Sequence, residues 1–303
     1  MGFVLPQVGP ASSPQAILHV AQRAEESGYD SVWVTERLLY PLKPQTPYPA
    51  SPDGSLPDVY KIAFDPLETL TFVAAQTKRI AVGTSVLNMP FYNPVLLARR
   101  LTTLDVFSGG RLRVALGQGW SKDEYDAVGI APRGLGKRAD EFIAVLKTIW
   151  TTDPAEFHGR YFQIPRSIIQ PKPVQKPHPP LYLAAFSPGA LKRAATMANG
   201  WNPTGVPLDG MKHMIASLKD MAKAVKRDAA SFEIVVRANL SITQRPLGKE
   251  RWLFSGTLDE IKTDIEAVRA LGASETFFDA TFSPDVRTEG DFLRILDEIR
   301  RIV

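Results

Sequence analysis

Polar side chains follow several short apolar runs of this 303-residue chain, at places where they could do chemistry. Thr35 and Glu36 follow one such run, and Gln118 and Gly119 follow another. A carboxylate such as Glu36 can act as a general acid or base, or it can form an ion pair with a nearby arginine such as Arg37. The amide of Gln118 donates and accepts hydrogen bonds without a charge, which suits a ring edge with mixed donors and acceptors.

A second candidate site is the start of a predicted helix at Ser187 and Pro188. Serine is a preferred N-cap residue, and proline is favoured at the first helical position. The free N–H groups and the dipole of a helix start favour an anion, and no acidic residue follows in the first turn. Lys192 and Arg193 lie just beyond it. Ser187 therefore either caps the helix alone, or caps it and also helps to bind a phosphate.

Composition excludes several other chemistries. The chain has no cysteine, so disulfides, cysteine-ligated zinc and thiol catalysis are ruled out. Its four histidines show no metal-ligand spacing, and we expect no metal. The net charge is only +4, without a basic, aromatic footprint for nucleic acid. No apolar run is long enough for a membrane span, and the N-terminus does not read as a signal peptide. We expect a cytoplasmic protein with a small-molecule substrate.

The elements that must position these residues alternate between short β-branched runs and segments of helical periodicity. This alternation predicts a parallel sheet with helical crossovers. Two stretches, 40–64 and 153–180, are rich in proline, lack a period and are interpreted as insertions. The predicted strands are 3–5, 31–34, 80–86, 111–116, 181–186, 200–202, 232–243 and 275–280.

Eight such strands predict an α/β fold, specifically a (β/α)₈ TIM barrel with insertions after the second and before the fifth strand. A doubly wound sheet is the main alternative, but the turn after the first strand has no G-x-G-x-x-G sequence. We expect one domain over residues 1–303. Barrel enzymes react at the carboxyl ends of their strands, where Glu36, Gln118 and Ser187 stand.

Several motifs agree in order and spacing with one family. They are SVWV at 31–34, IAVGTSV at 80–86, NPVLLA at 93–98, SGGRL at 108–112, PKPVQ at 171–175 and GW at 200–201. The chain thus resembles the luciferase-like monooxygenases, most closely the branch that uses the deazaflavin coenzyme F420. The resemblance runs from the first strand to the eighth and also implies a homodimer.

The resemblance implies a place for each part of the cofactor. The ring is expected against a bulge at Ser85 and Val86, where the family often has a non-proline cis peptide. The second-strand residues lie near the ring, the glutamine and glycine after the fourth strand lie near its tail or edge, and the fifth-strand exit binds the phosphate. The implied cofactor-binding residues are Thr35, Ser85, Val86, Gln118, Gly119, Phe186, Ser187, Pro188 and Gly189.

One departure from the family concerns the acid. Many F420-using relatives have a histidine just after the second strand, whereas this chain has Glu36 and Arg37 there. Either Glu36 is the catalytic acid, with a raised pKa, or the reaction needs no protein acid at that point.

Three functions follow as hypotheses. The first is an F420-dependent oxidoreductase that transfers a hydride to or from a small organic substrate. The second is an FMN-dependent monooxygenase that uses reduced flavin and oxygen, and the third is a flavin-binding barrel without catalysis. In the first, the substrate enters beneath the 40–64 loop, and Tyr40, Tyr48, Tyr60 and Phe64 wall an apolar pocket.

Overall fold

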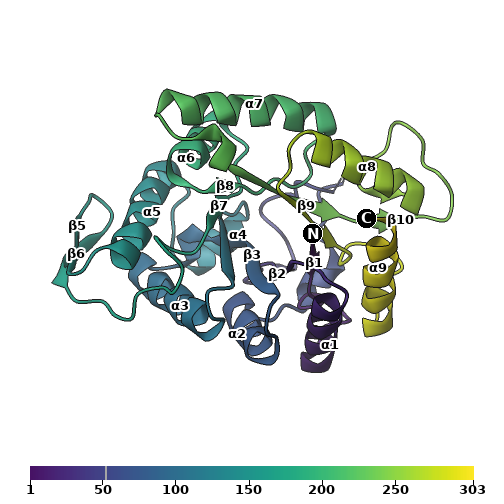
Figure 1. Cartoon of the computed structure of the whole chain (residues 1–303), viewed down its shortest axis with the longest axis horizontal. Coiled ribbons are helices and arrows are strands. Elements are labelled where there is room, and N and C mark those ends of the chain that lie inside the picture. Colours follow the sequence, from purple (N-terminus) through teal and green to yellow (C-terminus); the bar gives the residue numbers. More distant parts are fainter. Residues whose placement is uncertain (52) are drawn as a thin grey trace.

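Eight parallel strands close into a barrel in the computed structural model, which describes residues 1–51 and 53–303 (Figure 1). Going round the barrel, the strands follow the order β1-β12-β9-β8-β7-β4-β3-β2, and β2 pairs with β1. The predicted TIM barrel is therefore confirmed. The barrel strands are β1 (Gly2–Val4), β2 (Ser31–Val34), β3 (Ala81–Asn88), β4 (Leu112–Gly117), β7 (Leu181–Leu183), β8 (Gly200–Trp201), β9 (Glu233–Asn239) and β12 (Glu275–Asp279).

Helices surround this barrel and connect its strands. Four of them begin in the same way, with a capping side chain followed by proline: the caps are Ser13, Asp65, Asn93 and Ser187. In each case the capping oxygen accepts a backbone N–H of the first turn. The helices are α1 (Pro14–Glu26), α2 (Pro66–Gln76), α3 (Pro94–Phe107), α4 (Lys122–Ala127), α5 (Leu135–Thr151), α6 (Pro188–Met197), α7 (Leu208–Ala224), α8 (Leu258–Ala270) and α9 (Glu289–Ile302).

Two local features differ from the predicted elements. The short helix α4 was not predicted, because its six residues are too few to show a period. The predicted strand 232–243 is divided: β9 stays in the barrel, while β10 (Ser241–Ile242) pairs with β11 (Ser255–Gly256) outside it. The insertion before β7, which is predicted as such, forms an antiparallel hairpin of β5 (Ala155–His158) and β6 (Gln163–Ser167).

Large apolar side chains fill the middle of the barrel. The Trp33 indole stacks on the Phe277 ring at a centroid distance of 4.4 Å, and both side chains are fully buried. Gly83 makes this possible, because a Cβ at that position would lie 2.4 Å from the Trp33 ring. Since side chains alternate along a strand, the next inward residues toward the carboxyl ends lie above this apolar layer.

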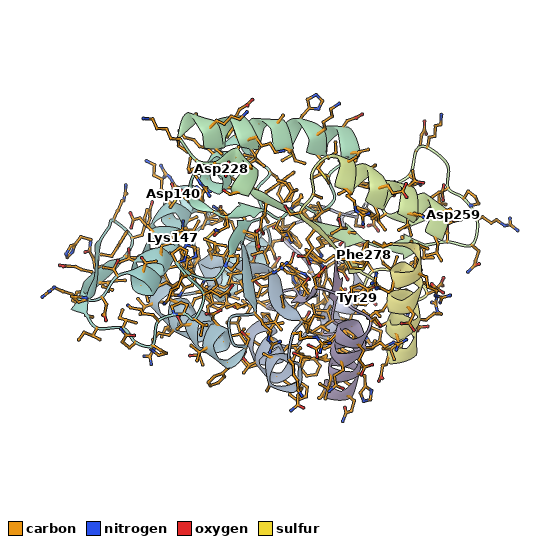
Figure 2. All side chains as sticks on the ribbon, viewed as in Figure 1. Tyr29, Asp140, Lys147, Asp228, Asp259 and Phe278 are labelled. Atoms are coloured by element: carbon orange, nitrogen blue, oxygen red, sulfur yellow. The ribbon has the colours of Figure 1, made fainter. Side chains whose placement is uncertain are left out.

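Outward-facing strand residues pack against the helices. Figure 2 shows side chains filling the space between the two layers, with Tyr29 and Phe278 on the side of α9. The Tyr29 hydroxyl donates to the carbonyl oxygen of Leu296 at 2.7 Å, which joins the start of β2 to the last helix. In the part of the chain that the structure describes, no helix combines the length and the apolar character that crossing a bilayer requires.

Candidate active site

Four polar residues meet inside the barrel at the carboxyl ends of its strands. Arg237 of β9 forms an ion pair with Asp279 of β12, and Asp279 is fully buried. One Arg237 nitrogen also donates to the Ser85 carbonyl oxygen at 2.8 Å and lies 3.4 Å from the Thr35 hydroxyl. Burial lowers the pKa of Arg237, but the charge and the hydrogen bond of Asp279, together with Tyr60 and Tyr48, raise it above its ordinary value. The arginine is therefore a fixed cation at the barrel mouth.

The end of β3 is irregular, as the family resemblance implies. The Ser85–Val86 peptide bond is cis, and the pairing of β3 with β4 shifts between Thr84 and Leu87. The Ser85 hydroxyl donates to the side-chain oxygen of Asn202 at 2.8 Å. A Cβ at Gly117 on β4 would lie 2.6 Å from Val86, so glycine leaves room for this bulge. Ser85 and Val86 thus stand in the barrel mouth beside Thr35.

Glu36 faces the loops that lead into α2 and α3. One carboxylate oxygen accepts the backbone N–H of Asn88 at 2.6 Å, and the other accepts the hydroxyl of Tyr92. Burial raises the pKa of Glu36 to about 7, although both hydrogen bonds lower it. The carboxyl group can therefore hold or release a proton near neutral pH. Neither oxygen pairs with Arg37, so the alternative of an ion pair with that arginine is wrong.

Arg37 pairs instead with Glu124 of α4, at 3.0 Å, and both side chains are at least nine-tenths buried. The guanidinium carbon lies 4.9 Å from the centre of the Tyr60 ring and 5.0 Å from that of Trp120. Tyr48 contacts both rings, with centroid distances of 6.0 and 5.4 Å. These residues join the loop after β2 to the segment after β4.

The 40–64 loop covers the barrel mouth with part of the predicted aromatic wall. Tyr48 and Tyr60 take part, and Tyr60 also reaches Phe282, which follows β12. The Tyr40 hydroxyl donates to Asp58 at 3.0 Å within the loop, and Phe64 is 40% exposed. The part of these two residues in the wall stays a prediction. The wall gains Trp120, which the loop sequence could not reveal.

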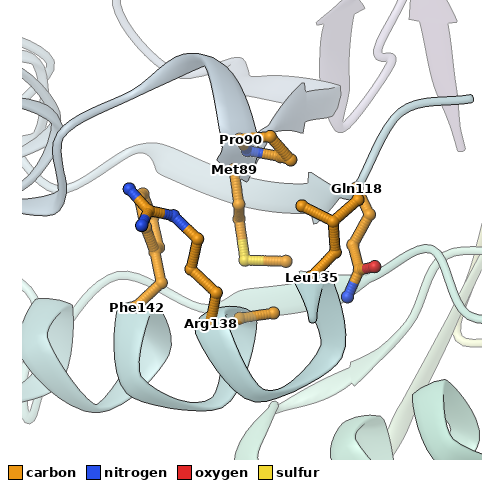
Figure 3. Close-up of a pocket in the computed structure, with 7 residues that line it drawn as sticks. Met89, Pro90, Gln118, Leu135, Arg138 and Phe142 are labelled. Carbon is orange, nitrogen blue, oxygen red and sulfur yellow. The ribbon is translucent and has the colours of Figure 1, made fainter. Parts of the chain in front are cut away.

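Gln118 lies between two small adjoining cavities at the ends of β4 and β7. One has an empty volume of about 200 Å³ and is also lined by Met89, Leu135 and Arg138 (Figure 3). The other, of about 220 Å³, is lined by the segment 183–185, Ala190 and Arg193. Gly119 has a left-handed conformation with φ +78°, and the adjacent Gln118 carbonyl accepts the Tyr125 hydroxyl at 2.9 Å.

The start of α6 is open to solvent. The residues 186–189 are exposed, and a Cβ built on Gly189 would meet nothing within 4 Å. Pro188 has no N–H, Ala190 donates to the Ser187 side chain, and Leu191 donates to the Ser187 carbonyl. Among the described residues, this leaves the Gly189 N–H free in the first turn. Ala185 and Ala190, which flank this turn in the chain, both line the second cavity.

Sequence reasoning missed Arg237, Asp279 and Asn202 as members of this site. The sequence does contain a signal that could have identified Arg237 and Asp279. Each is a charged residue near the carboxyl end of its strand and follows a run of apolar residues, and the two strands are neighbours in the barrel. A buried charge in a parallel sheet needs a partner, and the register supplies it. No group of three or more acidic or histidine side chains in the described residues is arranged to hold a metal ion.

The closed barrel, with a polar site at the carboxyl ends of its strands, defines the class as a (β/α)₈-barrel enzyme. Residues 1–275 match the family model of the luciferase-like monooxygenases, and the chain belongs to this family. An uncharacterized protein of Mycobacterium tuberculosis is 33% identical over 209 residues, which cover 69% of this chain and 74% of that protein.

Two characterised proteins illustrate the cofactors found among its relatives. The FMNH₂-dependent dimethylsulfone monooxygenase of Pseudomonas putida is 31% identical over 204 residues, covering 66% of this chain and 54% of that enzyme. The solved F420-dependent secondary alcohol dehydrogenase, in complex with an F420–acetone adduct, superposes with a TM-score of 0.79. It is 20% identical and covers 100% of this chain and 97% of that one. The chain is a luciferase-like oxidoreductase from a family whose members use FMN or F420.

Proposed function

We propose that this protein is a coenzyme F420-dependent oxidoreductase that transfers a hydride between the deazaflavin and a small organic substrate. The observation that carries the proposal is the open start of α6 with cations beyond it. Arg138 stacks on the Phe162 ring at 4.7 Å and forms no ion pair with any described residue. Lys192 is exposed one turn into α6. FMN ends at its phosphate, whereas F420 continues into an acidic tail that such cations would bind.

The described residues fit such a cofactor. The free N–H of Gly189 and the acid-free first turn of α6 would hold its phosphate. Gln118 would meet the ring edge or the chain that joins ring and phosphate, and Thr35, Ser85 and Val86 would support the ring at the barrel mouth. When bound, the deazaflavin supplies or accepts the hydride. The protein orients it, covers it with the 40–64 loop and excludes water.

In this proposal Glu36 is the group that holds a proton near the reacting atoms. Its carboxyl is protonated in part at neutral pH, because its pKa lies at about 7. Tyr92 and Asn88 hold both of its oxygens, so its position is fixed before a substrate arrives. No histidine is needed at this strand end, because a carboxyl group with such a pKa can serve as a general acid.

The alternative is an FMN-dependent monooxygenase, favoured by the identity of 31% to the dimethylsulfone enzyme. Equilibrium binding of F420 and FMN to the purified protein, measured side by side by cofactor fluorescence, separates the two. We expect tight binding of F420 and weak binding of FMN. In the variant Arg138→Gln, F420 affinity should fall about ten-fold while FMN affinity stays unchanged, since only the tail reaches this arginine.

Tight binding of FMN alone would overturn the proposal and make oxygen consumption the next assay. A protein that binds F420 tightly, yet oxidises or reduces nothing in a broad substrate screen, would instead be a flavin-binding barrel without catalysis.

A further inference from the structure

Arg37 stands out among the buried arginines because most of its donors have no acceptor. Its Nη2 donates to Glu124, but Nε and Nη1 are buried and have no hydrogen-bond partner among the described residues. A guanidinium carries five N–H groups, and a buried donor without a partner costs stability. The side chain is only 6% exposed, so bulk water does not replace the missing partners.

Arg111, on the outside of the barrel, is a half-buried arginine with a structural role, and it serves as a comparison. Its Nε donates to the Ser108 carbonyl oxygen at 2.6 Å. Both terminal nitrogens donate twice, to oxygens within residues 74–80, at distances of 2.7 to 3.1 Å. All five donors of Arg111 are satisfied. The nitrogens of Arg37 that lack a hydrogen-bond partner therefore reflect the position of this residue at the mouth of the barrel.

The surroundings of Arg37 come from three strand ends. Arg37 itself follows β2, Trp120 follows β4, and Tyr60 contacts Phe282 after β12. Burial raises the pKa of Tyr60 well above its ordinary value, and the charges of Arg237 and Arg37 both act against this. Tyr60 thus lies within electrostatic reach of both arginines, above the polar floor of the barrel.

Both arginines at this mouth already have an acidic partner. Arg37 is paired with Glu124, and Arg237 is paired with Asp279. An anionic substrate would bring an unpaired charge into a buried site and would lose its hydration there. A neutral acceptor oxygen can take the two free N–H groups without adding charge. The rings of Tyr48, Tyr60 and Trp120 surround the guanidinium, and an aromatic environment suits a planar, conjugated molecule.

We propose that Arg37 is a substrate-binding residue whose Nε and Nη1 donate to a carbonyl oxygen of a neutral, planar, conjugated substrate. This inference rests on the proposed function, because it assigns the substrate class of the same site. It concerns binding alone, and so it can be tested on the protein without cofactor, whichever cofactor the protein uses.

The test uses three probes with one ring skeleton, titrated into the purified protein by calorimetry. Menadione carries two carbonyl oxygens, 2-methylnaphthalene carries none, and 2-naphthoate is an anion. The chain has no cysteine, so menadione cannot form a thiol adduct with it. We expect menadione to bind at least ten-fold more tightly than either other probe. Equal affinity for 2-methylnaphthalene, tighter binding of 2-naphthoate, or no binding of menadione would each overturn the proposal.

Three variants locate the effect. Arg37→Lys keeps a charge beside Glu124 but removes Nε and Nη1, and should lower menadione affinity about ten-fold. The matched control Arg111→Lys should lower the unfolding temperature and leave menadione affinity unchanged. Glu124→Gln keeps both free N–H groups but leaves the Arg37 charge uncompensated, and should raise the affinity for 2-naphthoate.

Menadione affinity that is the same in Arg37→Lys as in the unmodified protein would contradict the role of Arg37. If Arg37→Lys does not fold, the comparison of the three probes on the unmodified protein still decides, because it needs no substitution. Failure of the proposed function would appear separately, as a lack of F420 binding.

Discussion

Glu36 joins two properties that a catalytic acid needs, a fixed position and a pKa of about 7. If it donates the proton in turnover, Glu36→Gln should lower kcat about 100-fold or more while cofactor affinity changes little. Turnover of the unmodified enzyme should fall as the pH rises through 7, because only the protonated form donates. Steady-state kinetics and cofactor titration measure the two quantities. Turnover equal to that of the unmodified enzyme would remove Glu36 from the mechanism.

Tyr92 offers a conservative control for this residue. Its hydroxyl donates to Glu36 and stabilises the carboxylate, which lowers the pKa of that group. Tyr92→Phe should therefore move the midpoint of the pH–rate profile upward and retain substantial turnover. A merely structural role for the pair would lower activity without moving the midpoint.

The same carboxyl group should make stability depend on pH. Its pKa rises from an ordinary 4.5 in the unfolded chain to about 7 in the folded protein. Between these values only the folded state retains the proton, so the free energy of unfolding should fall, by at most about 3 kcal/mol, as the pH rises through this window. Urea unfolding at pH 5 and pH 8 measures the change. Glu36→Gln should lose it, whereas Glu266→Gln, on the exposed face of α8, should keep it.

At the scale of elements, the start of α6 is the candidate phosphate site, and a pair of variants can show whether it is more than an ordinary helix cap. Pro188→Asp places a carboxylate in the turn that would face the phosphate and should weaken cofactor binding about ten-fold. The start of α1 has the same Ser-Pro sequence and the same acid-free first turn. Pro14→Asp is therefore the matched control and should leave affinity unchanged. Equal affinities in both variants would move the phosphate site elsewhere.

The 40–64 loop acts as an element although it has no regular structure over most of its length. Gln45 donates to Asp123 and Asp126 of α4, and the Lys122 N–H donates to Thr46. Together with the pair of Arg37 and Glu124, these bonds tie the loop to the segment after β4. The cover of the barrel mouth is thus built from the 40–64 loop and the segment after β4, which are about 80 residues apart in sequence.

At the scale of the molecule, one exposed apolar face supports the homodimer that the family resemblance implies. Leu96 and Phe107 are 63% and 66% exposed and lie on one side of α3, because 11 residues complete about three helical turns. On the adjacent α2, Phe72 is 41% exposed, and Arg100 joins the helices through Glu68 at 2.6 Å. We propose that a second copy of the chain covers this face.

Sedimentation velocity checks this proposal. The unmodified protein should sediment as a dimer and Phe107→Glu as a monomer, because a buried charge at the interface has no partner. Ile168→Glu is the control, since Ile168 is 77% exposed but lies beside the hairpin. A monomeric unmodified protein would refute the proposed interface.

Most of the barrel could be predicted because its signals are local. Strands such as 31–34 are short β-branched runs, and the caps at Ser13, Asp65 and Asn93 lie next to the helices that they start. The (β/α)₈ order then follows from counting, and the fold fixes which strand ends share a face. Thr35, Ser85 and Gln118 were predicted for this reason, since each stands at a strand exit. The family resemblance added the cis peptide at Ser85.

Sequence alone thus determined the barrel, its family and the strand ends that carry the candidate site, because hydrophobic period, capping and motif order are all local properties of the chain. Only the tertiary structure decided the partners of the charged groups. In the folded chain Glu36 accepts a hydrogen bond from Tyr92, Arg37 forms an ion pair with Glu124, and Arg237 forms an ion pair with Asp279. Each pair joins separate elements, and in this barrel burial and register, which depend on the whole closed sheet, set both the partner and the pKa.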